Sequence, residues 1–531
     1  MSSFILLMAI IILICLLLTK LSSKIGVPVL LAFILLGMLF GSDGIVKIHF
    51  DNYGLAEQIC SVALIFIMFY GGFGTSLKTA KPIIVKSLLL SSLGVVLTAV
   101  VTGLFCYTAL GIGFWESMLI GSVISSTDAA SVFSILRSKR MNLKDNTAPM
   151  LELESGSNDP CSYMLTVIVL SAMSGESIGW RLIYLVFAQI MLGVLFGIVT
   201  ALISAWALRK MKHANNGIDT VFVFSIALIS YAGASVIGGN GYLSAYLAGI
   251  LLGNTPFQNK KRMVHFFDGV TTLMQMLIFF ILGLLSFPSQ LGNIALPALA
   301  IAFFLTFVAR PLSIFAILTQ FRCSMQQKLL VSWTGVRGAA SIVFAIMATV
   351  HPAYLKYDVF HIVLFIVLFS ISVQGSLIPF VAKKLNMTDD DSNIMKTFSD
   401  YSEEMPIQFV RISISKDHPW ANRMVKEITL IPELLLALII RGTKRIIPKG
   451  NTKILEGDIM VLSAFSLENE QEGSLNEVLI DIDHEWIGKS LAEIKLGQEK
   501  LVVAIRRDGK VIVPNGKTVI KGKDVLVISQ L

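Results

Sequence analysis

One run of the sequence, LELESGSNDP at residues 151–160, places three carboxylates and an amide in the middle of an apolar segment: Glu152, Glu154, Asn158 and Asp159. At the centre of a membrane-spanning helix each charge costs roughly 2.5 to 3.5 kcal/mol, so such residues face a protein interior or a water-filled cavity. On a helix, Ser155 and Asp159 are four residues apart and share a face, as do Glu154 and Asn158. Carboxylate, hydroxyl and amide oxygens are ligands that hard cations prefer. The run therefore predicts a cation or proton site within a membrane.

Two other apolar segments carry polar residues at mid-depth. GSVISSTDAASVFS contains Thr127 and Asp128, and VSWTGVRGAASIVFA contains Arg337 between two glycines. Small and polar residues at this depth indicate locally unwound helices, and a pair of them at matching positions in two halves points to the binding site of an inverted-repeat transporter. Facing lipid, Asp128, Glu154, Asp159, Arg310 and Arg337 would together cost on the order of 15 kcal/mol. We therefore expect these five residues to meet inside the helical bundle.

The elements that must position these residues are apolar runs of about 20 residues. Thirteen such runs begin near residues 3, 27, 56, 84, 113, 147, 181, 219, 239, 269, 293, 328 and 359. The sequence is 55% hydrophobic and 15% charged, with a mean hydropathy of +0.76, which is typical of a polytopic membrane protein. We expect an α-helical membrane protein of about 13 spans, with repeats made of spans 1 to 6 and 8 to 13 and two crossed, discontinuous helices.

Basic residues gather in alternate loops, and this asymmetry predicts the topology. By the positive-inside rule these loops are cytoplasmic, so we expect the N-terminus outside the cell and the C-terminal tail inside. The net charge of +8 reflects this topology, and we do not expect nucleic-acid binding. The loops in question carry Lys20, Lys24, Lys78, Lys81, Arg137, Lys139, Arg140, Lys144, Arg209, Lys210, Lys212, Lys260, Lys261, Arg262, Arg322, Lys328, Lys383 and Lys384.

The tail after about residue 389 is a duplication. Residues 417–465 align without gaps to residues 483–531, with 19 identities in 49 positions. Each copy reads as a strand, a short helix and further strands separated by turns. His418 and His484 occupy equivalent positions, where a turn residue and a ligand contact explain them equally well.

Taken together, the membrane motifs resemble the monovalent cation:proton antiporters of the NhaP-like branch, and ESGSNDP resembles its potassium/proton, cell-volume-regulation members. The motifs are SSTDAAS, ESGSNDP, NGYLSAYLAGILLGN at residues 240–254, the Arg310-Pro311 pair and TGVRGAAS. The resemblance implies exchange of K⁺ or Na⁺ for H⁺ by a homodimer in the cell membrane, with roles in pH homeostasis and cell volume regulation.

The resemblance also implies roles for individual residues. Asp159 would bind the cation and the proton in turn, with Ser155 and the main-chain carbonyl of Thr127 completing the cation shell. Asp128 would balance the helix ends at the crossing, while Glu154 would pair with Arg337 and hold Asn158. An asparagine at this position, where electrogenic relatives have a second aspartate, implies electroneutral one-for-one exchange. Arg310 is a further supporting residue of the expected site.

The chemistry of exchange follows from burial. Desolvation favours the neutral form of a carboxylate at mid-membrane and a bound cation favours the charged form, so cation and proton compete for one site. The role of Glu152, seven residues before Asp159, stays open between an acid in an access funnel and a partner of a basic residue. The sequence does not decide between K⁺ and Na⁺.

The pattern I-x-R…I-x-P-x-G-x-T…G-D in the tail resembles the RCK-C, or TrkA C-terminal, regulatory domain. It implies dimerisation and, in some bacteria, binding of a small ligand such as cyclic di-AMP; a purely structural dimerisation module is equally consistent. The expected domains are residues 1–387 for the antiporter, 388–408 for a linker, 409–466 and 475–531 for the RCK-C-like copies, and 467–474 for an acidic linker.

Two other classes of function are a tail-gated cation channel and a sensor that transports nothing, and the sensor would show no cation-dependent proton flux. A cation channel gated by the tail is the alternative, because RCK-C domains also serve channels. No selectivity-filter signature such as TVGYG is present, however, and a titratable Asp159 favours coupled exchange. We find no Ser/His/Asp, P-loop or zinc-ligand spacing and no G-x-G-x-x-G before either tail copy, so we expect a transporter without a cofactor, and no enzyme.

Overall fold

The protein divides into two compact units, Met1–Glu403 and Glu404–Leu531. The computed structural model describes residues 2–25, 28–139, 141–175, 179–210, 217–255, 260–353 and 355–389 of the first unit. In the second unit it describes residues 407–414, 418–428, 435–442, 444–465, 474–480, 484, 486–494, 500–507, 510–512, 514–522 and 524–530.

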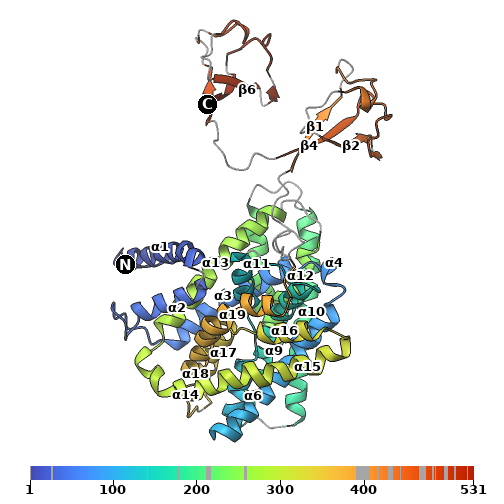
Figure 1. The fold of residues 1–531 in the computed structure, drawn as a ribbon. Coiled ribbons are helices and arrows are strands. Elements are labelled where there is room, and N and C mark those ends of the chain that lie inside the picture. Colours follow the sequence, from blue (N-terminus) through green and yellow to red (C-terminus); the bar gives the residue numbers. More distant parts are fainter. Residues whose placement is uncertain are drawn as a thin grey trace. The chain divides into compact units, whose positions relative to one another are not determined.

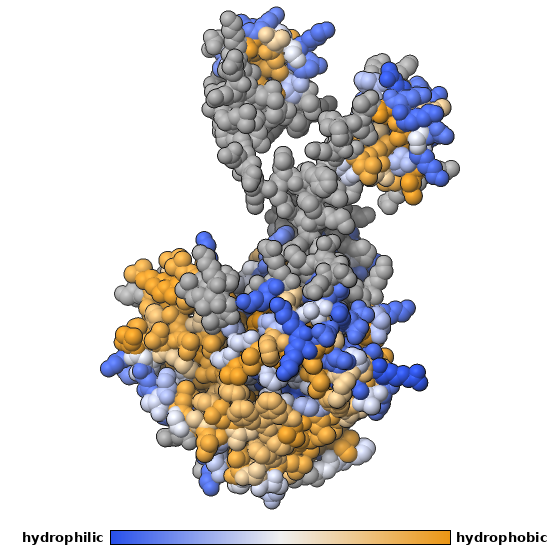
Figure 2. Space-filling view, viewed as in Figure 1, coloured by the Kyte–Doolittle hydropathy of each residue, from blue (hydrophilic) through white to orange (hydrophobic). Residues whose placement is uncertain are grey.

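The first unit consists of helices (Figure 1). Among the described residues of this unit, seven helical segments are long and apolar enough to cross a membrane by length and composition. Apolar side chains cover much of its visible surface (Figure 2). In chain order the helices of the described residues are α1 (Ser2–Ile25), α2 (Val29–Phe40), α3 (Tyr53–Gly74), α4 (Leu77–Ala80), α5 (Ile84–Leu89), α6 (Val95–Leu110), α7 (Phe114–Val123), α8 (Ala129–Ser138), α9 (Thr147–Met173), α10 (Trp180–Lys210), α11 (Ile218–Val236), α12 (Gly241–Gly253), α13 (Lys260–Leu284), α14 (Pro288–Phe304), α15 (Arg310–Leu318), α16 (Met325–Trp333), α17 (Ala339–Val350), α18 (Val359–Phe369) and α19 (Ser376–Lys384). A 3₁₀ turn, Thr319–Phe321, follows α15.

Three segments contain a π-helical turn: Leu90–Gly94 between α5 and α6, Leu305–Ala309 between α14 and α15, and Ser370–Gly375 between α18 and α19. Such turns are rare and are often found at functional sites. The first two lie in the fourth and eleventh of the predicted spans. Those spans are seven apart, as expected for two repeats of six spans with one connector.

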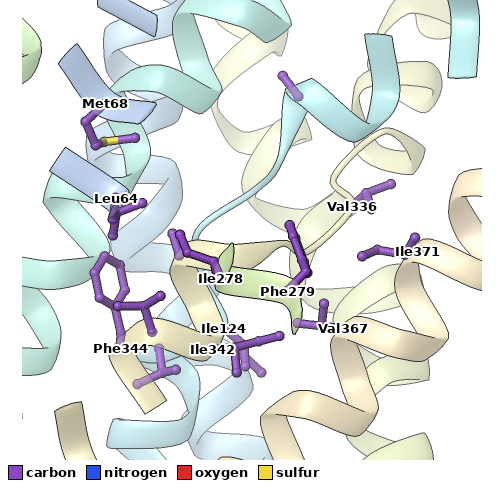
Figure 3. Packing of buried hydrophobic residues seen from close by; sticks show 14 of the residues in the cluster. Leu64, Met68, Ile124, Ile278, Phe279, Val336, Ile342, Phe344, Val367 and Ile371 are labelled. Atoms are coloured by element: carbon purple, nitrogen blue, oxygen red, sulfur yellow. The ribbon is translucent and has the colours of Figure 1, made fainter. Parts of the chain in front are cut away.

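Both predicted unwound segments are confirmed. α7 ends at Val123 and α8 begins at Ala129, while α16 ends at Trp333 and α17 begins at Ala339. Where the two extended segments meet, the N–H of Asp128 donates to the carbonyl of Val336 at 2.7 Å. Ile124 and Val336, from the two segments, belong to the same buried apolar cluster (Figure 3). The interrupted helices therefore cross at their breaks, and apolar packing surrounds the crossing.

Glycines allow the scaffold helices to pack backbone against backbone. A Cβ on Gly249 of α12 would meet the carbonyl of Phe69 in α3, and a Cβ on Gly37 of α2 would meet that of Phe280 in α13. Because no side chain separates the axes, α3 with α12 and α2 with α13 form close pairs beside the crossing.

The tail contains two sheets with the same topology. The first has the order β1-β4-β2-β3 and the second β5-β8-β6-β7, with antiparallel pairing throughout. An irregularity lies at equivalent places, between Leu436 and Leu438 and between Val502 and Ala504. The predicted short helix is a single 3₁₀ turn, Val425–Glu427, in the first copy. The strands are β1 (Ile407–Ser413), β2 (Leu435–Arg441), β3 (Lys444–Ile446), β4 (Ile459–Phe465), β5 (Ser474–Leu479), β6 (Lys500–Arg507), β7 (Lys510–Ile512) and β8 (Val525–Gln530).

A buried aspartate bound by an arginine fork recurs in both tail copies. Arg441 donates to both carboxylate oxygens of Asp458 at 2.8 Å, and Arg507 donates to those of Asp524 at 2.7 and 2.6 Å. The hydrogen bonds from Arg441 hold the pKa of Asp458 below its usual value. The duplicated sequence thus keeps its polar anchor as well as its strands.

The repeated histidines lie in equivalent turns. The N–H of Trp420 donates to Nδ1 of His418 at 3.2 Å, and the N–H of Trp486 donates to Nδ1 of His484 at 3.3 Å. These contacts give both histidines a structural role in the turn.

Candidate cation site

Asp159 lies on α9 against the extended segment between α7 and α8. Its side chain is 7% exposed, and its Oδ1 accepts a hydrogen bond from the hydroxyl of Ser126. One turn earlier on α9, Ser155 Oγ donates to the carbonyl of Thr127 at 2.8 Å and accepts from the N–H of Ala129 at 2.9 Å. The predicted oxygen donors Asp159, Ser155 and Thr127 are therefore brought together.

Asn158 holds the same extended segment from the adjacent position of α9. It is fully buried, and its Nδ2 donates to the hydroxyl of Thr127 at 2.5 Å. The hydrogen bond that the structure gives for this amide goes to Thr127, and the expected contact of Asn158 with Glu154 stays a prediction. With its amide bonded to Thr127, Asn158 orients the segment that carries a predicted cation ligand.

Charged side chains compensate the helix ends at the crossing. Arg337 Nη1 donates to the carbonyls of Ser125 and Ser126, at 2.8 and 2.7 Å, just beyond the C-terminus of α7. The Asp128 carboxylate accepts from the N–H and hydroxyl of Ser131 at the N-terminus of α8. A cation near a helix C-terminus and an anion near an N-terminus both stabilise the helix dipoles. This geometry agrees with the balancing role implied for Asp128.

The structure corrects the predicted pairing of Glu154. Its Oε1 lies 2.6 Å from Nη2 of Arg310, with the two side chains 1% and 2% exposed. Arg337 is held at the backbone carbonyls instead, whereas Arg310 begins α15 directly after a π turn. Gly335 leaves room for this arginine, because a Cβ there would lie 2.7 Å from Arg310 Nε. Glu154 therefore pairs with Arg310 and not with Arg337.

The first and last residues of the NGYLSAYLAGILLGN motif, Asn240 and Asn254, connect α12 to neighbouring segments. Asn240 caps α12 through the N–H of Leu243 at 3.0 Å and donates to the carbonyl of Pro160 at 2.8 Å. Asn254, after the end of α12, accepts from the N–H of Leu77 and donates to the carbonyl of Thr75. The hydrogen bond from Asn240 to Pro160 fixes α12 against α9 directly beside Asp159.

The site opens into a cavity of about 430 Å³. Asp128, Ser155 and Asp159 line it, together with Glu152. The cavity can hold a cation with several water molecules. Glu152, whose role the sequence left open, lines the same cavity as Asp159.

Two sets of lining residues were missed from the sequence. Ser126 directly precedes Thr127, which was singled out, and the signal available was its hydroxyl at that position. The second set is a polar stripe on α13, whose i, i+3, i+4 and i+7 spacing places it on one face. The members of this stripe are Asp268, Thr271, Thr272 and Gln275.

Comparison with known proteins agrees with this geometry. Residues 9–384 match the family described as sodium/hydrogen exchanger, transmembrane, and residues 409–464 and 475–529 match the TrkA-C domain. The chain is 31% identical over 471 residues to the K⁺/H⁺ antiporter NhaP2 of Shewanella baltica, and 32% identical over 464 residues to the K⁺/H⁺ antiporter NhaP of Alkalimonas amylolytica. Each alignment covers 86% of this chain and 80% of the relative.

A solved structure supports the fold. The sodium proton antiporter MjNhaP1 from Methanocaldococcus jannaschii superposes with a TM-score of 0.63 at 22% identity, covering 71% of this chain and 99% of that protein. The family match and the relatives' names define the class of the protein as a membrane cation:proton antiporter, and the solved structure agrees in fold. The chain belongs to the transmembrane sodium/hydrogen exchanger family and carries two TrkA-C domains.

Proposed function

We propose that the protein exchanges K⁺ for H⁺ one for one across the cell membrane, with Asp159 as the shared carrier. The observation that supports this most directly is the placement of one buried carboxylate, with the Ser155 hydroxyl and the Thr127 carbonyl nearby, in a cavity at the helix crossing. A buried carboxylate needs a compensating partner. Proton and cation each neutralise it, so binding of one releases the other. Two relatives are named as K⁺/H⁺ antiporters, and these names support K⁺ over Na⁺ as the ion of this protein.

Electroneutral exchange is part of the proposal. Asn158 cannot carry a proton near neutral pH, and its amide is used to hold Thr127. One carboxylate then carries one positive charge in each direction. Arg310 neutralises Glu154 in a permanent pair, and Asp128 is bound to the start of α8.

For the orientation, we propose an N-terminus outside the cell and a cytoplasmic tail. The cavity is lined by the first half of α9 and by the middle of α13. α9 begins after a basic loop and α13 begins within a basic run, and both are assigned to the cytoplasm. In the proposed orientation this conformation is open to the cytoplasm. Alternating access requires a second conformation that exposes Asp159 to the outside.

The tail is proposed to regulate exchange as part of a homodimer. A small ligand such as cyclic di-AMP, or contacts between tails, can shift transport only through a difference in affinity between two transport conformations. Deleting residues from 405 onward should leave exchange intact and change its response to pH. Identical pH profiles with and without the tail, with candidate nucleotides present or absent, would reduce the tail to an assembly module.

The experiment that tests the proposal uses everted vesicles loaded with a pH-sensitive dye. Separate additions of K⁺, Na⁺ and Li⁺ should dissipate the pH gradient, most strongly with K⁺. A potential-sensitive dye in proteoliposomes should show no potential generated by exchange. Stronger responses to Na⁺ than to K⁺ would make this a sodium antiporter, and a potential that follows the K⁺ gradient without proton movement would make it a channel.

A further inference from the structure

Pro160 directly follows Asp159 inside α9, and α9 nevertheless continues from Thr147 to Met173. Proline has no backbone N–H, so the carbonyl four residues earlier loses its helical hydrogen-bond donor. That carbonyl belongs to Gly156. Gly156 lines the same cavity as Ser155 and Asp159. The proline thus frees one main-chain oxygen in the turn of α9 that carries the candidate site.

The freed oxygen lies next to the Asp159 side chain by helix geometry. A side chain three residues after a helical carbonyl lies close enough to hydrogen-bond to it, as serine and threonine do. Asp159 stands three residues after Gly156. Tyr246 packs closely against the Cα of Gly156. A Cβ added to Gly156 would lie 2.8 Å from the tyrosine ring. The helix therefore places a carboxylate beside a carbonyl that lacks its helical donor, with no side chain at residue 156.

This arrangement is unfavourable unless something positive lies between the two groups. A carbonyl that has lost its helical donor needs another partner, and a carboxylate beside its negative end adds repulsion. A monovalent cation relieves both. Main-chain carbonyl oxygens also replace the hydration shell of K⁺ in channel filters, so this ligand suits a dehydrated monovalent ion.

We propose that the main-chain carbonyl of Gly156 is a ligand of the transported cation, and that Pro160 serves the site by keeping this carbonyl free. The inference rests on the proposed function, since it adds a ligand to the site at Asp159. The cation is then held by a carboxylate, a hydroxyl and two main-chain carbonyls, those of Thr127 and Gly156, with water from the cavity completing the shell.

The test is Pro160→Ala, which restores the N–H and lets it bond to the Gly156 carbonyl. A proline lies inside another helix, so Pro297→Ala in α14 is the matched control. In proteoliposomes the KM for K⁺ of Pro160→Ala should rise about tenfold, equivalent to about 1.4 kcal/mol, with the maximal rate within about twofold of the native protein. K⁺ should also protect the purified variant less against heat, because binding to the folded state stabilises it. Pro297→Ala should leave both readouts unchanged.

An unchanged KM and unchanged heat protection by K⁺ in Pro160→Ala would overturn the proposal. Loss of exchange with undiminished heat protection by K⁺ would overturn it as well, since binding would not need the carbonyl. If the alanine variant does not accumulate, Pro160→Gly restores the same N–H and gives the same test. Asp159→Asn, measured in parallel, separates the two levels: an active Asp159→Asn contradicts the proposed function itself, whereas an inactive one beside a native-like Pro160→Ala removes only the carbonyl ligand.

Discussion

Removing Arg310 should destabilise the membrane unit more than any other single change near the site. Its guanidinium lies 2.6 Å from Glu154, and both side chains are almost completely buried. Truncation to alanine leaves Glu154 as an uncompensated buried charge, which costs about 3 to 5 kcal/mol. That is between a fifth and all of the roughly 5 to 15 kcal/mol that commonly separates a folded domain from its unfolded state. We expect Arg310→Ala to lower the melting temperature in detergent by roughly 4 to 6 °C, given the unfolding entropy of a unit of this size.

The pairing itself is tested by a double-mutant cycle. Because the cost comes from the orphaned carboxylate, Glu154→Gln should restore most of the stability lost in Arg310→Ala. The same glutamine should not restore Arg337→Ala, whose lost contacts are with the carbonyls of Ser125 and Ser126. Melting temperatures of the singles and doubles give both coupling energies. Rescue of Arg337→Ala by Glu154→Gln, without rescue of Arg310→Ala, would refute the assigned pair.

Three further changes have defined outcomes. Gly338→Ala places a methyl group against Asp128 and should reduce both the amount of folded protein, measured by fluorescence-detected size exclusion, and exchange. Gly292→Ala, whose methyl group meets open space, should leave both native-like. A native-like Gly338→Ala would show that the crossing is looser than described. Asn158→Asp loses the donor to its threonine partner, so we expect altered pH dependence without electrogenic transport, and a large signal from a potential-sensitive dye would contradict this. The pKa of Asp458 is lowered by its arginine partner, so the stability it contributes is present above its unfolded pKa near 4 and is lost as the pH falls through the lower, folded pKa. The hydrogen-exchange protection factors of β4, which are corrected for the intrinsic pH dependence of exchange, should fall over that acid range in the native protein and much less steeply in Asp458→Asn. Equal slopes would count against the linkage.

Much of the candidate site follows from local spacing. Ser155 and Asp159 share a face of α9 because they are four residues apart, and the two breaks lie where small and polar residues interrupt apolar runs. The tail topology repeats because its sequence repeats. These features depend on periodicity and local propensity, which a sequence displays directly.

The partner of Glu154 could not be predicted in the same way. Two buried arginines, Arg310 and Arg337, lie far from it in sequence, and charge alone does not distinguish them. The choice is made by the crossing, where the bare carbonyls at the end of α7 bind Arg337 and leave Arg310 for the glutamate. The stripe on α13 was missed for a related reason, since it becomes meaningful only when that helix is placed beside the cavity.

The central claim is that Asp159 carries cation and proton in turn, and one measurement tests it most directly. Purified native protein and Asp159→Asn are reconstituted at equal amounts, and K⁺-driven proton movement is followed with a pH dye inside the liposomes. An amide cannot take up and release a proton near neutral pH, so the variant should be folded, as judged by its size-exclusion profile, and should show no exchange. Robust K⁺-dependent proton movement by Asp159→Asn would contradict the account.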